Sequence, residues 1–198
     1  MSCVRKINSG IEVNCSPLPG GVNDRLILLN KDDVVGYTLD PNMPLNVPGY
    51  KYVTAVARAT GTRGYLFEGV NNSIVVRKIA ERGAFRITYR TEIDFIAFDD
   101  NGTVEVTLEL LNKANLVAAY ESNREFHIIG LTGGLFVQTN SGDTSDADTA
   151  GGHRITLIAN KEGEYGKRLG IFTGVAPNFV YDYNATKAVF EGLLTPAP

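Results

Sequence analysis

Apolar and polar residues alternate most regularly between Phe85 and Phe95. The odd positions are apolar except for Thr91, whereas the even positions are charged or carry a hydroxyl group. A period of two predicts a β-strand with one buried face. Residues 84–98 in an extended conformation would span about 50 Å, whereas a compact chain of 198 residues is about 40 Å across. We therefore expect this strand to bend or to project from the body of the protein.

A second strand candidate comes directly before this one. Residues 73–80 are rich in β-branched side chains, and residues 81–83 form a short link that ends in glycine. Because such a link is typical of a β-hairpin, we expect a long hairpin arm over about residues 73–98. Phe95 and Ile96 are both apolar, so the alternation changes phase there and predicts a β-bulge near Phe95.

Shorter strands are predicted along most of the remaining chain. Glycine, proline and small polar residues separate them. The first two are expected to pair as a hairpin, and the three between residues 116 and 138 are expected to form a meander. The predicted strands cover residues 25–29, 33–39, 52–59, 64–68, 116–120, 125–129, 135–138, 154–159 and 168–173.

The segment 103–110 fits two different periods. Its apolar residues alternate as in a strand, yet Val104, Leu108 and Leu111 are also spaced as on one face of a helix. Periodicity alone favours a strand here.

The two ends of the chain differ from its middle. Residues 1–22 contain several glycines and prolines, which predicts an extended N-terminal segment. Residues 185–194 follow Asn184 and could form a short capped helix. We therefore expect a β domain over residues 1–174 and a C-terminal extension over residues 175–198.

Together these patterns predict a mainly β protein, built as an antiparallel β-sandwich or a partly closed barrel. The chain is 43% hydrophobic and 21% charged, which is typical of a globular protein. No apolar run approaches the roughly 18 residues that a membrane-spanning helix needs. The N-terminus lacks the apolar stretch of a secretory signal, so we expect assembly in a cytoplasm. The net charge is −3 and the basic residues are scattered, so we do not expect sequence-specific nucleic-acid binding.

The histidines and cysteines are the candidate metal ligands of the chain. His127, His153, Cys3 and Cys15 could in principle supply a zinc site, but their spacing fits no compact zinc module. Both histidines lie in or at the start of predicted strands, where an ordinary strand residue is the simpler interpretation.

Neither the acidic loop nor the serine and cysteine residues form a known catalytic or metal-binding motif. Asp143, Asp146 and Asp148 share one polar loop, yet their order is not that of a calcium-binding EF-hand. No serine or cysteine lies in a nucleophile motif. Paired carboxylates distant in sequence stay open as a glycosidase alternative. We expect no enzyme activity, no metal and no cofactor.

Several segments share their order along residues 1–174 with one known family. They are Met1-Ser2-Cys3 with Ser9-Gly10-Ile11, Cys15, Gly20-Gly21 and the strand 26–29, then 109–121, 126–130, Gly134-Leu135, a Ser-Gly-Asp-Thr loop, and 154–157 leading to Glu162 and Glu164. In this order the chain resembles the tail tube proteins of bacteriophages that infect Bacteroidetes-type hosts. Residues 175–198 depart from the family pattern.

The resemblance implies a β-sandwich with one flanking α-helix over about residues 100–113, in place of the strand that periodicity favours. It further implies six copies in a ring, with rings stacked into a tube inside the virion tail. The partners would be other copies of the chain and other tail proteins. Viral DNA would pass through the tube during ejection without sequence-specific binding, and a negative lumen would keep it from adhering.

The polar face of the long strand then becomes the candidate assembly surface. Arg86, Arg90, Glu92 and Asp94 alternate in charge sign and could contact a neighbouring subunit or the lumen, although a solvent-exposed face is the ordinary interpretation. Two alternatives stay open. One is another ring component of the virion, such as a tail completion or neck protein. The other is a host- or carbohydrate-binding β-sandwich, against which the absence of tryptophan counts.

Overall fold

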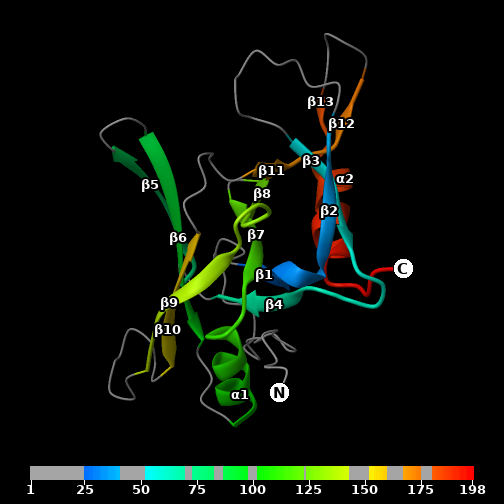
Figure 1. Ribbon diagram of the computed structural model, residues 1–198. Helices are drawn as coiled ribbons and strands as arrows, with labels where there is room; N and C mark the ends of the chain where they lie inside the picture. Colours follow the sequence, from blue (N-terminus) through cyan, green and yellow to red (C-terminus); the bar gives the residue numbers. More distant parts are fainter. Residues whose placement is uncertain are drawn as a thin grey trace, which may run out of the picture.

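The computed structural model describes residues 25–40, 52–69, 73–82, 87–97, 102–122, 124–142, 152–159, 167–174 and 180–198, with the backbone alone at residues 81, 82, 87–89 and 103. These residues form a mainly β protein with two α-helices (Figure 1). The strands are β1 (Arg25–Asn30), β2 (Val34–Leu39), β3 (Tyr52–Arg58), β4 (Tyr65–Glu68), β5 (Val75–Arg82), β6 (Ile87–Ala97), β7 (Leu116–Ser122), β8 (Glu125–Ile129), β9 (Leu135–Gly142), β10 (His153–Ala159), β11 (Lys167–Leu169), β12 (Phe172–Thr173) and β13 (Val180–Tyr181). The helices are α1 (Gly102–Leu111), α2 (Tyr183–Gly192) and a 3-10 turn, η1 (Lys31–Asp33).

Eleven strands form one hydrogen-bonded set in the order β2-β3-β11-β8-β7-β9-β10-β6-β5, and β1 joins it by pairing with both β4 and β7. The pairing is antiparallel except between β11 and β3, so the sheet is mixed. Only one residue pair, Leu116 with Leu135, links β7 to β9. The set therefore folds into two layers, one of β5, β6, β10 and β9 and one around β1, β7 and β8. This confirms the expected mainly β fold, but the sheet is not closed into a barrel, because β2 and β5 end it on opposite sides of the molecule (Figure 1).

The strand β1 lies at the centre and is buried on both faces. Leu26 and Leu28 face the core between the two strand layers, whereas Ile27 and Leu29 face a second core beneath α2. This explains its continuous apolar sequence, because a strand covered on both sides has no polar face.

The segment that periodicity alone assigns to a strand is the helix α1. Val104, Leu108 and Leu111 lie on its buried face against the first core, while Val106 points to solvent. The strand interpretation was wrong, because the buried side chains recur every three to four residues, as on one face of a helix, and not at every second residue. The flanking helix over about 100–113, which the resemblance implied, is confirmed.

The long hairpin over about 73–98 is confirmed by the antiparallel pairing of β5 and β6, which runs in register from Val75 opposite Asp94 to Arg82 opposite Ile87. Its turn lies outside the described residues. The predicted bulge near Phe95 was wrong. Pairing with β10 is continuous there, and Ala97 in place of Ile96 takes the next buried position.

The predicted hairpin of β1 and β2 was also wrong. β1 pairs with β4 and β7, whereas β2 pairs with β3. The turn η1 separates them: Asn30 donates a side-chain hydrogen bond to Asp33 at 3.1 Å, and the Lys31 amide donates to the Asn115 carbonyl at 2.8 Å. These contacts hold the chain at a corner, so the two strands enter different parts of the sheet.

The predicted meander of β7, β8 and β9 is only half present. β7 and β8 pair over five positions, but β8 has β11 as its other neighbour and β9 crosses to pair with β10. Gly130 and Gly134 both adopt positive φ in the connection, and a Cβ at Gly134 would overlap the Asn115 side chain. A left-handed backbone at these two glycines carries the chain from one layer to the other.

The C-terminal segment forms a third layer. The Asp182 side chain accepts a hydrogen bond from the Ala185 amide at 2.9 Å and caps α2. The predicted helix over residues 185–194 is therefore present, but it begins at Tyr183, and Asn184 lies inside its first turn. Phe190 is fully buried beneath the helix and lies 4.9 Å from the Phe126 ring, centroid to centroid. Arg58 of β3 holds the C-terminal end of α2, because its guanidinium group donates hydrogen bonds to the backbone carbonyl groups of Gly192 and Leu193.

Candidate assembly surface

The outer face of the β5–β6 hairpin carries the predicted assembly residues. Arg90, Glu92 and Asp94 lie at alternate positions of β6 and point away from the core, whereas Thr91, Ile93 and Phe95 between them are buried. Because strand side chains alternate between faces, the sequence pattern placed these residues correctly. Arg86 lies outside the described residues.

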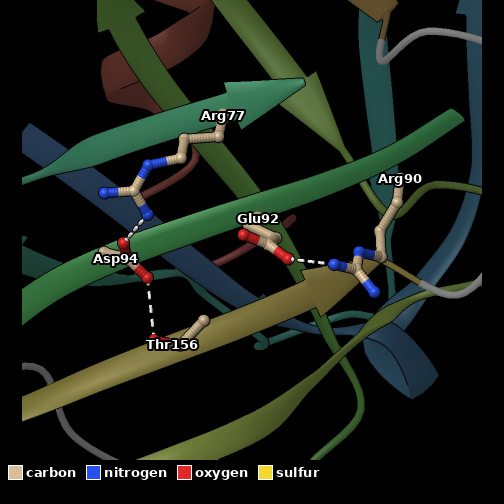
Figure 2. Close-up of polar contacts among 5 residues, drawn as sticks. All are labelled: Arg77, Arg90, Glu92, Asp94 and Thr156. Atoms are coloured by element: carbon tan, nitrogen blue, oxygen red, sulfur yellow. Dashed lines mark hydrogen bonds and ion pairs between the residues drawn. The ribbon is translucent and has the colours of Figure 1, made fainter. Parts of the chain in front are cut away.

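These side chains are bound to one another and to neighbouring strands, as Figure 2 shows. The Arg90 guanidinium lies 2.6 Å from the Glu92 carboxylate. Asp94 binds Arg77 of β5 and accepts a hydrogen bond from the Thr156 hydroxyl of β10 at 2.7 Å. Asp94 thus connects three adjacent strands of one layer.

The burial of these groups is uneven. The side chains of Glu92 and Asp94 are only 14% and 19% exposed, whereas that of Arg77 is 54% exposed. The carboxylates are therefore shielded by their partners, and arginine side chains form the accessible part of the surface. The sequence predicted the alternation of charge but not that Arg77 and Thr156 would hold Asp94, since neither is near it in the chain.

Exposed apolar side chains lie on the same face. Val75 is opposite Asp94, and Phe136 of β9 is opposite Ile158 of β10, so both share the outer face with the charged residues. Both are among the exposed large hydrophobic side chains of the protein. A mixed apolar and arginine-rich surface is typical of protein contact surfaces.

Edge strands bound the layered sheet at its two ends. Within the described part of the chain, β5 pairs only with β6, and β2 pairs only with β3. The short strand β4 likewise pairs only with β1. A strand with one partner presents its remaining backbone N–H and C=O groups for pairing with another strand.

Polar side chains of three strands gather around the buried ring of His127. His127 of β8 is 8% exposed, and its ring stacks on Tyr120 of β7 with centroids 4.9 Å apart. Arg168 of β11 binds Glu125 at 2.9 Å, and the His127 Nε2 atom lies 4.0 Å from the same carboxylate group. Burial, and then the positive charges of Lys78 and Arg168, lower the pKa of His127 to about 4.

The neighbours of His127 respond to the same environment. Burial raises the pKa of Tyr120 to about 12. Burial also lowers the pKa of Lys78, which lies on the inner side of β5, and the charge of Arg168 lowers it further. His127 was expected to be an ordinary strand histidine; its position between Phe126 and Ile128 was the signal for burial, but the charged neighbours come from strands far away in the sequence.

The other candidate ligands do not come together in the described residues. The Nδ1–H group of His153 donates a hydrogen bond to the side-chain oxygen of Asn140 at 3.1 Å, and its ring packs against Gly142. Within the described ranges, no group of three or more histidine, cysteine or acidic side chains is placed to hold a metal ion. Cys3, Cys15 and the acidic loop of Asp143 lie outside these ranges. No helix in the described part of the chain is long and apolar enough to cross a membrane.

Comparison with known proteins identifies no relative: no family model, no curated protein and no solved structure matches this chain.

Proposed function

We propose that this protein is a structural subunit of a bacteriophage tail tube, and that copies of it associate into rings, six to a ring, which stack around a channel for DNA. The observation that carries the proposal is the hairpin of β5 and β6. It ends the sheet with an eight-residue strand that has no second partner in the described part of the chain, next to a face of arginines and exposed apolar groups. The resemblance of the chain to tail tube proteins in the order of its segments supports the same function.

The charge of the hairpin face favours a role in subunit contacts over lining the lumen. Arg77, Arg90 and Arg154 lie on this face with only two described carboxylates, Glu92 and Asp94, and both carboxylates are paired with arginine. DNA would adhere to such a face, because arginine neutralises phosphate charge. The net charge of −3 per chain leaves acidic residues elsewhere for the channel.

The register of β5 and β6 shows where the hairpin can be shortened. Ile79 and Arg90 lie directly opposite each other, so residues 80–89 can be replaced by Asn-Gly, which forms a two-residue hairpin turn. Ile93 and Phe95, which are buried, stay in place. We expect the shortened chain to keep its circular dichroism spectrum and to stay monomeric by light scattering.

Rings or tubes formed by the unaltered chain in negative-stain images would be lost in the shortened chain. A matched control is Val106→Ala, because Val106 is an exposed apolar residue on α1 away from the hairpin. Assembly of the shortened chain would contradict the role of the hairpin. A strictly monomeric unaltered chain at all concentrations would contradict the proposed function.

A further inference from the structure

The buried side chain of His127 belongs to a row that crosses four adjacent strands. In register order the row consists of Tyr52 of β3, Arg168 of β11, His127 of β8 and Tyr120 of β7. Directly opposite residues of neighbouring strands point to the same face of a sheet. Phe126 packs against Phe190 of α2, so the row, which includes the next residue along β8, faces the other side of the sheet.

Charged side chains surround the ring of His127 on this face. Arg168 lies directly opposite it and binds Glu125 at 2.9 Å, and Glu125 precedes His127 by two residues on β8. Burial, and then the positive charges of Lys78 of β5 and of Arg168, lower the pKa of His127. Tyr120 stacks on the ring, and burial raises the pKa of its hydroxyl group to about 12, so it stays neutral. A proton on His127 would add a third positive charge to Lys78 and Arg168, whose charges Glu125 already offsets.

The neutral form of His127 fits this position, whereas the charged form does not. Its Nδ1 atom is buried and has no hydrogen-bond partner in the described part of the chain. Its Nε2 atom lies 4.0 Å from the Glu125 carboxylate, which is beyond hydrogen-bond distance. A protonated imidazole has two N–H donors, and both would lack an acceptor here. The ring is therefore expected to take up a proton only when its surroundings open.

The weakest connection near His127 is the strand β11. Within the described residues, β11 alone joins β3 to β8, and it pairs with β3 at two positions and with β8 at three. On its other side β8 pairs with β7 at five positions. Protonation of His127 would place like charges directly opposite each other on β8 and β11, which destabilises a strand pair.

We propose that His127 is an acid-sensitive trigger, whose protonation separates β11 from β8 and releases the part of the sheet formed by β2, β3 and β11. The first core stays closed, because β10 pairs with β6 at six positions and with β9 at seven. The trigger lies within a single chain, so it does not depend on the proposed function.

Hydrogen exchange of the full chain, followed by mass spectrometry at pH 7 and pH 5, tests this inference. The opened state protonates His127 near pH 6.5, whereas the closed state has a pKa of about 4. Opening should therefore become on the order of 20-fold more frequent between pH 7 and pH 5, which lowers the protection factors of peptides from β8 and β11 by the same factor.

Dilute urea distinguishes this local opening from unfolding of the whole chain. At pH 5 and well below the unfolding midpoint, protection of β11 should hardly change with urea, because a small opening exposes little surface. Protection of β10 should fall with urea as expected for global unfolding. If β11 and β10 lost protection with the same urea dependence, the chain would unfold as one unit and the inference would be overturned.

Two substitutions test the role of the charges. His127→Phe keeps a planar ring beside Tyr120 and should abolish the difference between pH 7 and pH 5 in β8 and β11. Lys78→Met removes one of the two opposing cations at an exposed position, so it should reduce the 20-fold effect without disturbing the core. Lys113→Met on the far side of α1 is the matched control and should leave the effect unchanged.

The variants also supply the results that would contradict the trigger. A pH effect that persists in His127→Phe would assign it to other groups, and an undiminished effect in Lys78→Met would show that the hairpin charge does not act on His127. Either result would overturn the inference. Circular dichroism of each variant checks its fold, and Lys78→Met gives a decision even where His127→Phe does not fold.

Discussion

Arg58 is predicted to hold the C-terminal helix against the sheet. Its Nη1 atom donates to the carbonyl oxygens of Leu193 at 2.8 Å and Thr195 at 2.9 Å, and its Nη2 atom donates to that of Gly192 at 3.0 Å. A longer contact of 3.3 Å reaches the Thr62 carbonyl. The positive charge thus lies at the C-terminal end of α2, where the helix dipole favours a cation.

The expected cost of Arg58→Ala follows from these contacts. Hydrogen bonds from a charged donor contribute about 1.5–3 kcal/mol each, and a cation at a helix C-terminus adds up to about 2 kcal/mol when partly buried. Burial lowers the pKa of Arg58, which shows that desolvation opposes part of this gain. We therefore expect a loss of about 3 kcal/mol in the free energy of unfolding, well below the sum of the individual bonds.

Thermal unfolding and hydrogen exchange would measure this effect. For a chain of this length, a loss of about 3 kcal/mol lowers the Tm by about 6–12 °C. Hydrogen exchange of the backbone amides should accelerate more in α2 than in β1, because the substitution removes the contacts that anchor the helix. Arg58→Lys should recover only part of the loss, since one ammonium group cannot reproduce the forked guanidinium contacts.

The matched control is Arg63→Ala. Arg63 is the nearest other arginine in the chain and lies 5.9 Å above the Tyr65 ring, a contact that contributes about 0.5–1 kcal/mol at an exposed site. If Arg58→Ala were no more destabilising than Arg63→Ala, the clamp would not stabilise α2 and the reasoning would be refuted.

Three further outcomes are expected. The folded protein keeps His127 neutral down to a pKa of about 4 while the unfolded chain protonates it near 6.5, so up to about 3 kcal/mol of stability present above pH 6.5 should be lost as the pH falls to 4. Urea unfolding of His127→Phe should show a flatter pH profile, and an unchanged profile would contradict this linkage. Phe190→Ala should cost about 3–4 kcal/mol in urea unfolding, against less than about 0.5 kcal/mol for the exposed Val180→Ala, and equal costs would contradict the burial of α2. Asp94→Asn should cost only about 1 kcal/mol, because its partner Arg77 is exposed, and a loss above about 3 kcal/mol by calorimetry would be inconsistent with this ion pair.

Local patterns were sufficient for much of the β5–β6 hairpin. The alternation along β6 identified which side chains are buried, because successive side chains of any strand point to opposite faces. The same holds for the helix near Asn184, where a capping residue and a helical sequence are neighbours in the chain. Arg90, Glu92 and Asp94 could therefore be assigned to one face before any tertiary structure was known.

Strand partners could not be assigned in this way. β1 and β2 are adjacent in sequence, yet they pair with β4, β7 and β3, because η1 and the contact of Lys31 with Asn115 turn the chain between layers. β9 likewise does not pair with β8, because the positive φ angles of Gly130 and Gly134 turn the chain toward the other layer. The contacts that select a strand's partner involve residues distant in sequence, so the local pattern of apolar residues cannot predict that partner.

The sequence by itself determined where most strands form and which of their faces is apolar, since both depend on backbone geometry and on the spacing of side chains. Only the tertiary structure decided that residues 102–111 form a helix and not the strand that periodicity favours, that Arg77 and Thr156 hold Asp94, and that β2 and β5 end the sheet on opposite sides. These features depend on which surfaces are covered once the layers pack. Packing brings together residues that the chain itself keeps far apart.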